Sequence, residues 1–272
     1  MRPSADASPT GRPIGSLLEV VTQIDALDQP FRISLRADEG AADDHAALEV
    51  SRFRAADLVD PQSGAALRMV DLHAHWRAMP PARHCASLVF QRYCHRICAV
   101  AVAGWLRHGV VLDLAPDNVT VRFVNGSPDR IELVTAAEVG SDSAADLVRV
   151  VVDEHLERVA RILSVVRGPG MPNLLGNVAA GFAGALRRMS ELHPASDVLA
   201  AAELLLDADP RLRRGGCFRT LDGPCGPRLY YDRASCCHWY AAPDGRFCSW
   251  CSRLSQQERT ARFAAAMRAE SE

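Results

Sequence analysis

A long apolar segment places the strongest constraint on the fold of this chain. From Ala82 to His108 the sequence is apolar and helix-prone, and Gly109 follows in the position of a helix C-cap. The longest uninterrupted apolar run, Ile97 to Leu106, has ten residues. This is about half of the roughly 20 residues that a membrane-spanning helix needs. The segment therefore predicts one long helix and no membrane span.

The flanking segments show helical and extended patterns in turn. Apolar residues at helical spacing predict helices over residues 17–27, 64–78, 142–166, 172–192, 195–207 and 255–268. Apolar runs with β character predict strands over residues 31–35, 110–114, 119–124 and 130–134. Asn125-Gly126 lies between the last two strands and is typical of a hairpin turn. We expect an α+β fold that is mostly helical, with a small antiparallel sheet.

The composition divides the chain into three parts. Residues 1–15 are rich in Pro, Ser, Gly and Ala and lack the apolar region of a secretory signal, which predicts a disordered lead-in. Residues 16–209 form the predicted helical domain, and residues 210–272 form a segment with six of the nine cysteines. Between Arg211 and Arg253 there are eight arginines and three acidic residues. This basic tail either attracts an anionic ligand or is a solvated charged surface. The arginines that could attract such a ligand are Arg211, Arg213, Arg214, Arg219 and Arg228.

The overall charge excludes some classes of function. The chain has 31 basic and 33 acidic residues and a formal net charge of -2, whereas nucleic-acid-binding proteins carry a basic excess. It has no P-loop, dinucleotide glycine fingerprint or Ser-His-Asp order, the motifs of NTPases, dinucleotide enzymes and hydrolases. We expect a cytoplasmic protein, where thiols stay reduced and cysteines act as core residues or metal ligands.

Four cysteines within sixteen residues give the strongest chemical signal: Cys236, Cys237, Cys248 and Cys251. Adjacent side chains on extended backbone point to opposite faces, so directing Cys236 and Cys237 at one zinc ion would require strain. A [2Fe-2S] cluster offers two irons, and its four sulfur ligands need not converge on one point. The spacing favours the cluster, with zinc as the open alternative.

The same motif resembles the FhuF-like siderophore-iron reductases. The pattern Cys-Cys-x10-Cys-x2-Cys follows Arg233 and contains Tyr240, as in that family. The run 174–179, Leu-Leu-Gly-Asn-Val-Ala, is similar to the family's Trp-Gly-Asn-Val-Ala helix start, with Leu175 in place of Trp. Residues 86–118 resemble its long central helix and the hairpin after it. The resemblance covers about residues 83–251 and implies a [2Fe-2S] cluster on the four cysteines.

The resemblance also implies a function, the one-electron reduction of siderophore-bound Fe(III) to Fe(II). Siderophores hold Fe(III) through hard oxygen donors, which bind Fe(II) much more weakly, so one electron releases the iron. The expected partners are a ferric siderophore, a ferredoxin-type or flavin-reductase electron donor and, by peripheral association, a siderophore importer. Two alternatives stay open: a non-catalytic [2Fe-2S] electron carrier or sensor, and a zinc-stabilised interaction domain.

Three residues are candidate neighbours of the cluster. Arg233 and Arg246 flank the motif, where they either stabilise a reduced cluster or are solvated charges. His238 follows the second cysteine directly.

The remaining cysteines have weaker metal-binding patterns. We expect Cys217 and Cys225 to pack structurally, with spare ligands or a redox pair as the open alternatives. We expect Cys85, Cys94 and Cys98 to lie in the core, on the long helix. Residues 153–155, Asp-Glu-His, are expected on the exposed side of their helix.

Overall fold

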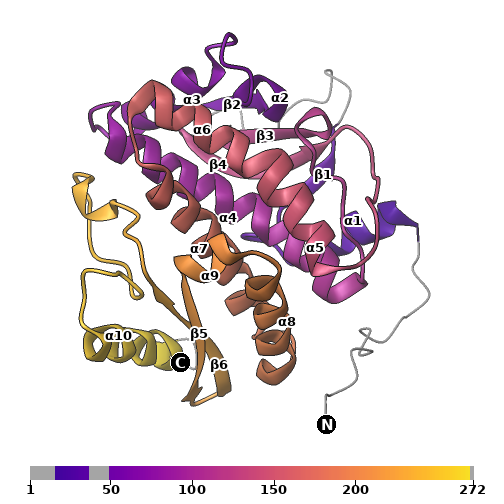
Figure 1. Ribbon diagram of the computed structural model, residues 1–272, viewed down its shortest axis with the longest axis vertical. Helices are drawn as coiled ribbons and strands as arrows, with labels where there is room; N and C mark the ends of the chain where they lie inside the picture. Colours follow the sequence, from indigo (N-terminus) through magenta and orange to yellow (C-terminus); the bar gives the residue numbers. More distant parts are fainter. Residues whose placement is uncertain (1–15, 37–48, 270–272) are drawn as a thin grey trace.

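The computed structural model describes residues 16–36 and 49–269, so the expected lead-in over residues 1–15 lies outside the described residues. The helices are α1 (Leu17–Asp25), α2 (Ala55–Leu58), α3 (Ala65–Trp76), α4 (Arg83–His108), η1 (Pro116–Asn118), α5 (Ala144–Val148), η2 (Arg149–Leu156), α6 (Glu157–Arg167), α7 (Met171–Met189), α8 (Ala195–Ala208), α9 (Pro210–Gly215), η3 (Trp239–Ala241) and α10 (Gln256–Ala269). The strands are β1 (Ile33–Leu35), β2 (Val50–Arg54), β3 (Val119–Val124), β4 (Ser127–Leu133), β5 (Gly216–Gly223) and β6 (Gly226–Arg233). The prediction of a mostly helical α+β fold is confirmed (Figure 1).

Helix α4 is the predicted long helix, and it forms the centre of the molecule (Figure 1). It packs against α7 on one side and β4 on another. The α4–α7 crossing is close because α7 has glycine where the helices meet: a Cβ on Gly181 would lie 2.9 Å from Cys98 Sγ. Cys85, Cys94 and Cys98 are fully buried, as expected. None of the described helices is long and apolar enough to cross a membrane.

A four-stranded sheet covers α4, in the order β1-β4-β3-β2. Strands β2, β3 and β4 are antiparallel, and β1 adds to the edge parallel to β4. The predicted strand over 110–114 was wrong, since these residues form only an isolated bridge between Leu112 and Glu138. The Val110 N–H caps α4 by donating to the Gly104 carbonyl, so this buried segment begins as a helix terminus rather than a strand. Strand β2 went unpredicted because its Val-Ser-Arg-Phe-Arg sequence alternates weakly.

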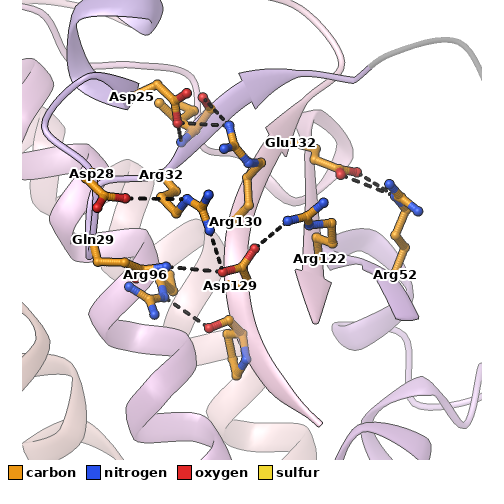
Figure 2. A network of polar contacts seen from close by, with 12 residues as sticks. Asp25, Asp28, Gln29, Arg32, Arg52, Arg96, Arg122, Asp129, Arg130 and Glu132 are labelled. Carbon is orange, nitrogen blue, oxygen red and sulfur yellow. Dashed lines mark hydrogen bonds and ion pairs between the residues drawn. The ribbon is translucent and has the colours of Figure 1, made fainter. Parts of the chain in front are cut away.

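The buried charges of the sheet are balanced within the chain. Figure 2 shows Asp129 accepting hydrogen bonds from Arg122 Nη2 at 2.6 Å and from Arg32 Nη1 and Gln29 Nε2 at 3.1 Å. These bonds outweigh burial, which on its own would raise the pKa of Asp129, and hold that pKa below its usual range. Arg130 pairs with Asp25 in the same way, at 2.8 Å.

The predicted helix over residues 142–166 is helical but irregular, because a π-helix, η2, lies between α5 and α6. The expectation that His155 is exposed was wrong: it is fully buried. Its Nδ1 lies 2.6 Å from the Leu114 carbonyl oxygen and its Nε2 lies 2.6 Å from the Tyr93 hydroxyl. The wider π turn changes which residues face the core, so 3.6-residue spacing misplaces this side chain. Burial lowers the pKa of His155 to about 4.

The C-terminal part adds a two-stranded hairpin, β5–β6, that the sequence did not predict. It packs against α7, α8 and α10. The expectation that Cys217 and Cys225 pack structurally was wrong, because both are exposed. On β5 the neighbouring Phe218 points inward, so Cys217 points to solvent. The last helix is as predicted: the Glu258 N–H donates to Ser255 Oγ at 3.2 Å, and the Ser255 N–H donates back to Glu258 Oε2 at 2.8 Å.

Candidate metal centre

The four motif cysteines lie on an irregular stretch, residues 234–255, which we call the cysteine segment. It connects β6 to α10 and packs against the first turns of α4 and α7. A Cβ on Gly176 would lie 1.9 Å from Ser235 Oγ, so glycine is required where α7 meets the segment. The Asn173 side-chain amide donates to the Cys236 carbonyl, and Ser87 Oγ donates to Asn173 Oδ1 at 2.7 Å. Two helices therefore position the backbone of the first cysteine pair.

The structure brings the four thiols together as a ring of neighbours. Each thiol lies close enough to two others to shift its pKa: Cys236 neighbours Cys237, Cys237 neighbours Cys248, Cys248 neighbours Cys251, and Cys251 neighbours Cys236. Cys237 and Cys251 are each 2 % exposed, whereas Cys236 and Cys248 are half-buried. The ring thus has an inner pair in the protein interior and an outer pair close to solvent.

Their interactions shift the pKa values of the four thiols in different directions. The hydrogen bond with Cys237 raises the pKa of Cys236, and burial raises it further. The pKa of Cys248 is lowered, chiefly by its hydrogen bond with Cys237. For Cys237 the bond with Cys236 lowers the pKa, but the bond with Cys248 and burial outweigh it. Burial raises the pKa of Cys251. Metal binding removes these protons, because thiolates are the ligands.

Backbone N–H groups point at two of the sulfur atoms. The His238 N–H donates to Cys236 Sγ at 3.4 Å, and the Arg253 N–H donates to Cys251. Directly after the cysteine pair, the backbone at His238 is left-handed, with a φ of 67°. Such N–H donors stabilise negative charge on sulfur and tune the potential of iron–sulfur centres.

Arg233 is the most unusual residue of the site. It is 1 % exposed, its Nη2 donates to Asn177 Oδ1, and its Nε and Nη1 have no hydrogen-bond partner. No carboxylate of the described residues pairs with it. Its positive charge also lowers the pKa values of Cys236, Cys237 and Cys248, although less strongly than the neighbouring thiols and burial shift them. A buried cation is costly without a counter-charge, so this guanidinium fits a multiply negative group beside it.

This donor set fits an iron–sulfur cluster. Four cysteine thiolates are the usual ligands of a [2Fe-2S] cluster, and the two N–H donors and the Arg233 guanidinium suit its negative charge. Among residues 16–36 and 49–269, no group of three or more His, Cys, Asp or Glu side chains is arranged as it would be around a bound metal ion. The fit to a cluster therefore rests on the type and proximity of the donors.

The other two predicted neighbours of the cluster differ from Arg233. His238 contacts Cys236 through its backbone, as described above. Arg246 is exposed and lies over the Trp239 ring, 5.0 Å from its centroid.

Three of the eight arginines of the basic tail are paired with acidic residues. Arg211 pairs with Asp153, Glu157 and Asp209. The other ion pairs of the tail are Arg213 with Glu203 and Asp207, and Arg219 with Asp232. These ion pairs weaken the case for the first part of the tail, Arg211 to Arg219, as an anion-attracting surface.

Sequence reasoning missed the polar residues that support the site: Ser87, Asn173 and Asn177. Asn177 Nδ2 donates to the Ser87 carbonyl at 3.0 Å while its Oδ1 accepts from Arg233. Both Ser87 and Asn177 are fully buried. One sequence signal pointed to Asn177, the Gly-Asn-Val-Ala run. In it, Gly176 allows the cysteine segment to approach α7 closely, and the buried amide of Asn177 follows.

Comparison with known proteins identifies a related family for the centre of the chain. A family model described as "Ferric iron reductase FhuF-like transporter" matches residues 87–221. This match confirms the resemblance drawn from the sequence motifs. It includes Ser87, Asn173 and Asn177, and the four cysteines lie beyond its end. No curated protein matches the chain.

Proposed function

We propose that this chain, FhuF-like over its central half, is a ferric-siderophore reductase whose Cys236, Cys237, Cys248 and Cys251 hold a [2Fe-2S] cluster. The observation that supports this most strongly is the ring of four thiols beside Arg233, a buried cation without a carboxylate partner. The description of the family, which names ferric iron reduction, supports the same chemistry.

A bound cluster would supply one electron at a time. The substrate is Fe(III) held by the oxygen donors of a siderophore, and it gains that electron to become Fe(II). Because hard oxygen ligands bind Fe(II) far more weakly, the iron then dissociates. Each further turnover would need one electron from an external donor.

The residues of the chain determine how such a group is held and approached. The inner pair, Cys237 and Cys251, is sealed from water, while Cys236 and Cys248 lie near the surface, where an electron can be exchanged with a docked molecule. Arg233 and the N–H groups of His238 and Arg253 favour the reduced, more negative state. Asn177 holds the Arg233 guanidinium in place.

The proposed partners follow from this chemistry. Since the chain has no flavin or nicotinamide motif, the electron would come from a ferredoxin-type protein or a flavin reductase. We place the reaction in the cytoplasm, where an imported ferric siderophore would be delivered, with peripheral association of this protein with the importer.

A single-turnover titration tests the proposal. Anaerobic protein is reduced with dithionite, desalted and mixed with a ferric siderophore in the presence of an Fe(II)-specific chelator. We expect one Fe(II) to be trapped for each cluster oxidised, in wild type and in the matched control Cys217→Ser. The Cys248→Ser variant should trap little or none. A cluster that stays reduced in the presence of the ferric chelate would overturn the reductase and favour the carrier or sensor.

A further inference from the structure

The surface around the cysteine segment carries positive charge that the chain does not neutralise. Arg83, Arg246 and Arg253 are exposed, and within the described residues no carboxylate forms an ion pair with any of them. The one acidic residue of the segment, Asp244, pairs with Arg77. This contrasts with residues 211–219, where acidic neighbours pair with Arg211, Arg213 and Arg219. Although the whole chain has a net charge of -2, unpaired positive charge therefore gathers at this site.

Aromatic rings lie among these arginines. The rings of His84 and His238 are 4.8 Å apart, and the His84 and Tyr240 rings are 6.3 Å apart. The Arg253 guanidinium lies over the Tyr240 ring, 4.1 Å from its centroid. We call this the basic aromatic surface; its members are Arg83, His84, His238, Tyr240, Arg246 and Arg253.

The basic aromatic surface adjoins the outer thiols. The backbone N–H of His238 contacts Cys236 Sγ at 3.4 Å, and Cys236 and Cys248 are the two thiols near solvent. The electrostatic field at the surface is positive: after burial, the charges of Arg83 and Arg253 lower the pKa of His84. A molecule docked here would meet both positive charge and the side of the thiol ring that lies closest to solvent.

We propose that the basic aromatic surface is the substrate-binding site and that it selects ferric chelates that are anionic and bind iron through aromatic oxygen donors, as catecholates do. Arginine guanidinium planes stack on aromatic rings and attract anions, and Tyr and His offer ring faces to the same ligand. Electrostatic steering by unpaired charge would also raise the association rate of an anion. This inference rests on the proposed function, since it assigns the class of chelate that the reductase would take.

Binding can be measured without any redox step by using gallium(III) chelates. Ga(III) has the charge and nearly the size of Fe(III) and cannot accept the electron. Titration calorimetry on the full, cluster-loaded chain would compare an anionic gallium tris-catecholate with a cationic gallium trihydroxamate. We expect the anionic complex to bind at least tenfold more tightly, with an affinity that falls as salt is raised.

Charge reversal at the two ends of α4 provides a matched pair of variants. Arg83 begins the helix and Arg107 lies in its last turn, so most of its 26 residues separate them. Both side chains are exposed. Arg83→Glu should weaken binding of the anionic gallium complex about tenfold or more, and Arg253→Glu should do the same. Arg107→Glu should leave it unchanged.

The outcomes separate this inference from the proposed function. Equal affinity for both chelates, or equal effects of Arg83→Glu and Arg107→Glu, would overturn the inference even if the protein reduces ferric siderophores. Equal affinity for the two chelates is also expected if the surface binds an acidic electron-donor protein and not the ferric chelate. Tight, Arg83-dependent binding of the anionic complex would support the inference as a binding site, whether or not the single-turnover titration succeeds.

Discussion

Two regions of this molecule bury arginine side chains, and they balance the charge in different ways. Around Asp129 the arginines meet carboxylates: Arg122, with 10 % of its side chain exposed, donates to Asp129 Oδ2, and Arg32 donates to Oδ1 (Figure 2). Arg233 is buried more deeply, yet its one hydrogen-bond partner among the described residues is the neutral amide of Asn177. The groups of the site that its charge acts on are the thiols of Cys236, Cys237 and Cys248.

The difference shows which region neutralises its buried charge with side chains of the polypeptide alone. The Asp129 network needs nothing from outside, because its positive and negative charges pair within the chain. The Arg233 site reaches a comparable balance only when its thiols are deprotonated, as they are in a metal centre.

Removing the central carboxylate of the balanced region should be the most damaging change. Asp129→Asn removes the carboxylate that Arg122 and Arg32 share, so we expect the free energy of unfolding to fall by about 3 kcal/mol. Asp28→Asn is the matched control, since Asp28 also contacts Arg32 but is 80 % exposed, and it should change the free energy by less than about 0.5 kcal/mol. Chemical denaturation measures both. Because the network is independent of metal, Asp129→Asn should have the same effect with and without the cluster.

Removing the unbalanced cation should have opposite effects in the two states of the protein. In metal-free protein Arg233→Met removes a buried charge without a counter-ion, which should raise the free energy of unfolding by about 2 kcal/mol. In loaded protein the same change removes the positive charge beside the cluster and should lower the reduction potential by roughly 60 to 120 mV.

Denaturation of metal-free protein and spectroelectrochemistry of loaded protein measure these two effects. Arg246→Met, at an exposed arginine of the same segment, should change both quantities little. Destabilisation of metal-free protein by Arg233→Met would mean that the chain itself satisfies this guanidinium, contrary to the comparison.

His155 is a third buried group, and it carries no charge at neutral pH because its pKa is lowered. The free energy of unfolding should therefore depend on pH. Burial lowers the pKa of His155 from the ordinary 6.5 to about 4, so the unfolded chain binds the proton at a higher pH than the folded chain does. Its contribution to stability is therefore full above pH 6.5 and is lost as the pH falls towards 4. Between pH 7 and 5 this amounts to between about 1 and 2 kcal/mol.

Thermal unfolding followed across pH should show this loss in wild type. The loss should be smaller in His155→Gln, since that variant has no imidazole to titrate. His75→Gln, at an exposed histidine of α3, should keep the wild-type slope. Identical slopes in all three proteins would contradict the neutral, buried state of His155.

The smallest effect is expected at the two cysteines outside the ring. Cys217 and Cys225 are exposed on the β5–β6 hairpin, so Cys217→Ser and Cys225→Ser should change the free energy of unfolding by less than about 0.5 kcal/mol. Metal analysis of the purified variants should find the wild-type iron content. Loss of iron from either variant would show that the ring of four thiols is not the whole ligand set.

Sequence patterns predicted the parts of the fold whose periodicity is strong. Helix α4 and the hairpin of β3 and β4 follow directly from an apolar run and an Asn-Gly turn. The sequence pattern did not predict the π-helix η2. Its wider turn breaks the 3.6-residue spacing from which His155 was predicted to be exposed. The strand predicted over 110–114 failed because apolar burial alone does not distinguish a strand from an extended connection.

At the candidate site, the sequence indicated the four cysteines that lie together but not the residues that support them. The spacing of the cysteines indicates that they gather, and the structure brings them together as a ring. Asn173 and Asn177 come from a helix more than fifty residues earlier, and Ser87 from one earlier still. Contacts across such separations carry no local pattern. That Arg233 is buried was equally hidden, since an arginine in a basic tail is most simply interpreted as a solvated charge.

The central claim is that the four thiols hold a [2Fe-2S] cluster, and metal analysis with an absorption spectrum tests it most directly. Protein purified without oxygen is assayed for iron, acid-labile sulfide and zinc, and its visible spectrum is recorded before and after dithionite. We predict two irons and two sulfides per chain, a red-brown colour that bleaches on reduction, and loss of both in Cys237→Ser. A colourless protein with stoichiometric zinc and no iron would contradict the account and identify a zinc-stabilised domain.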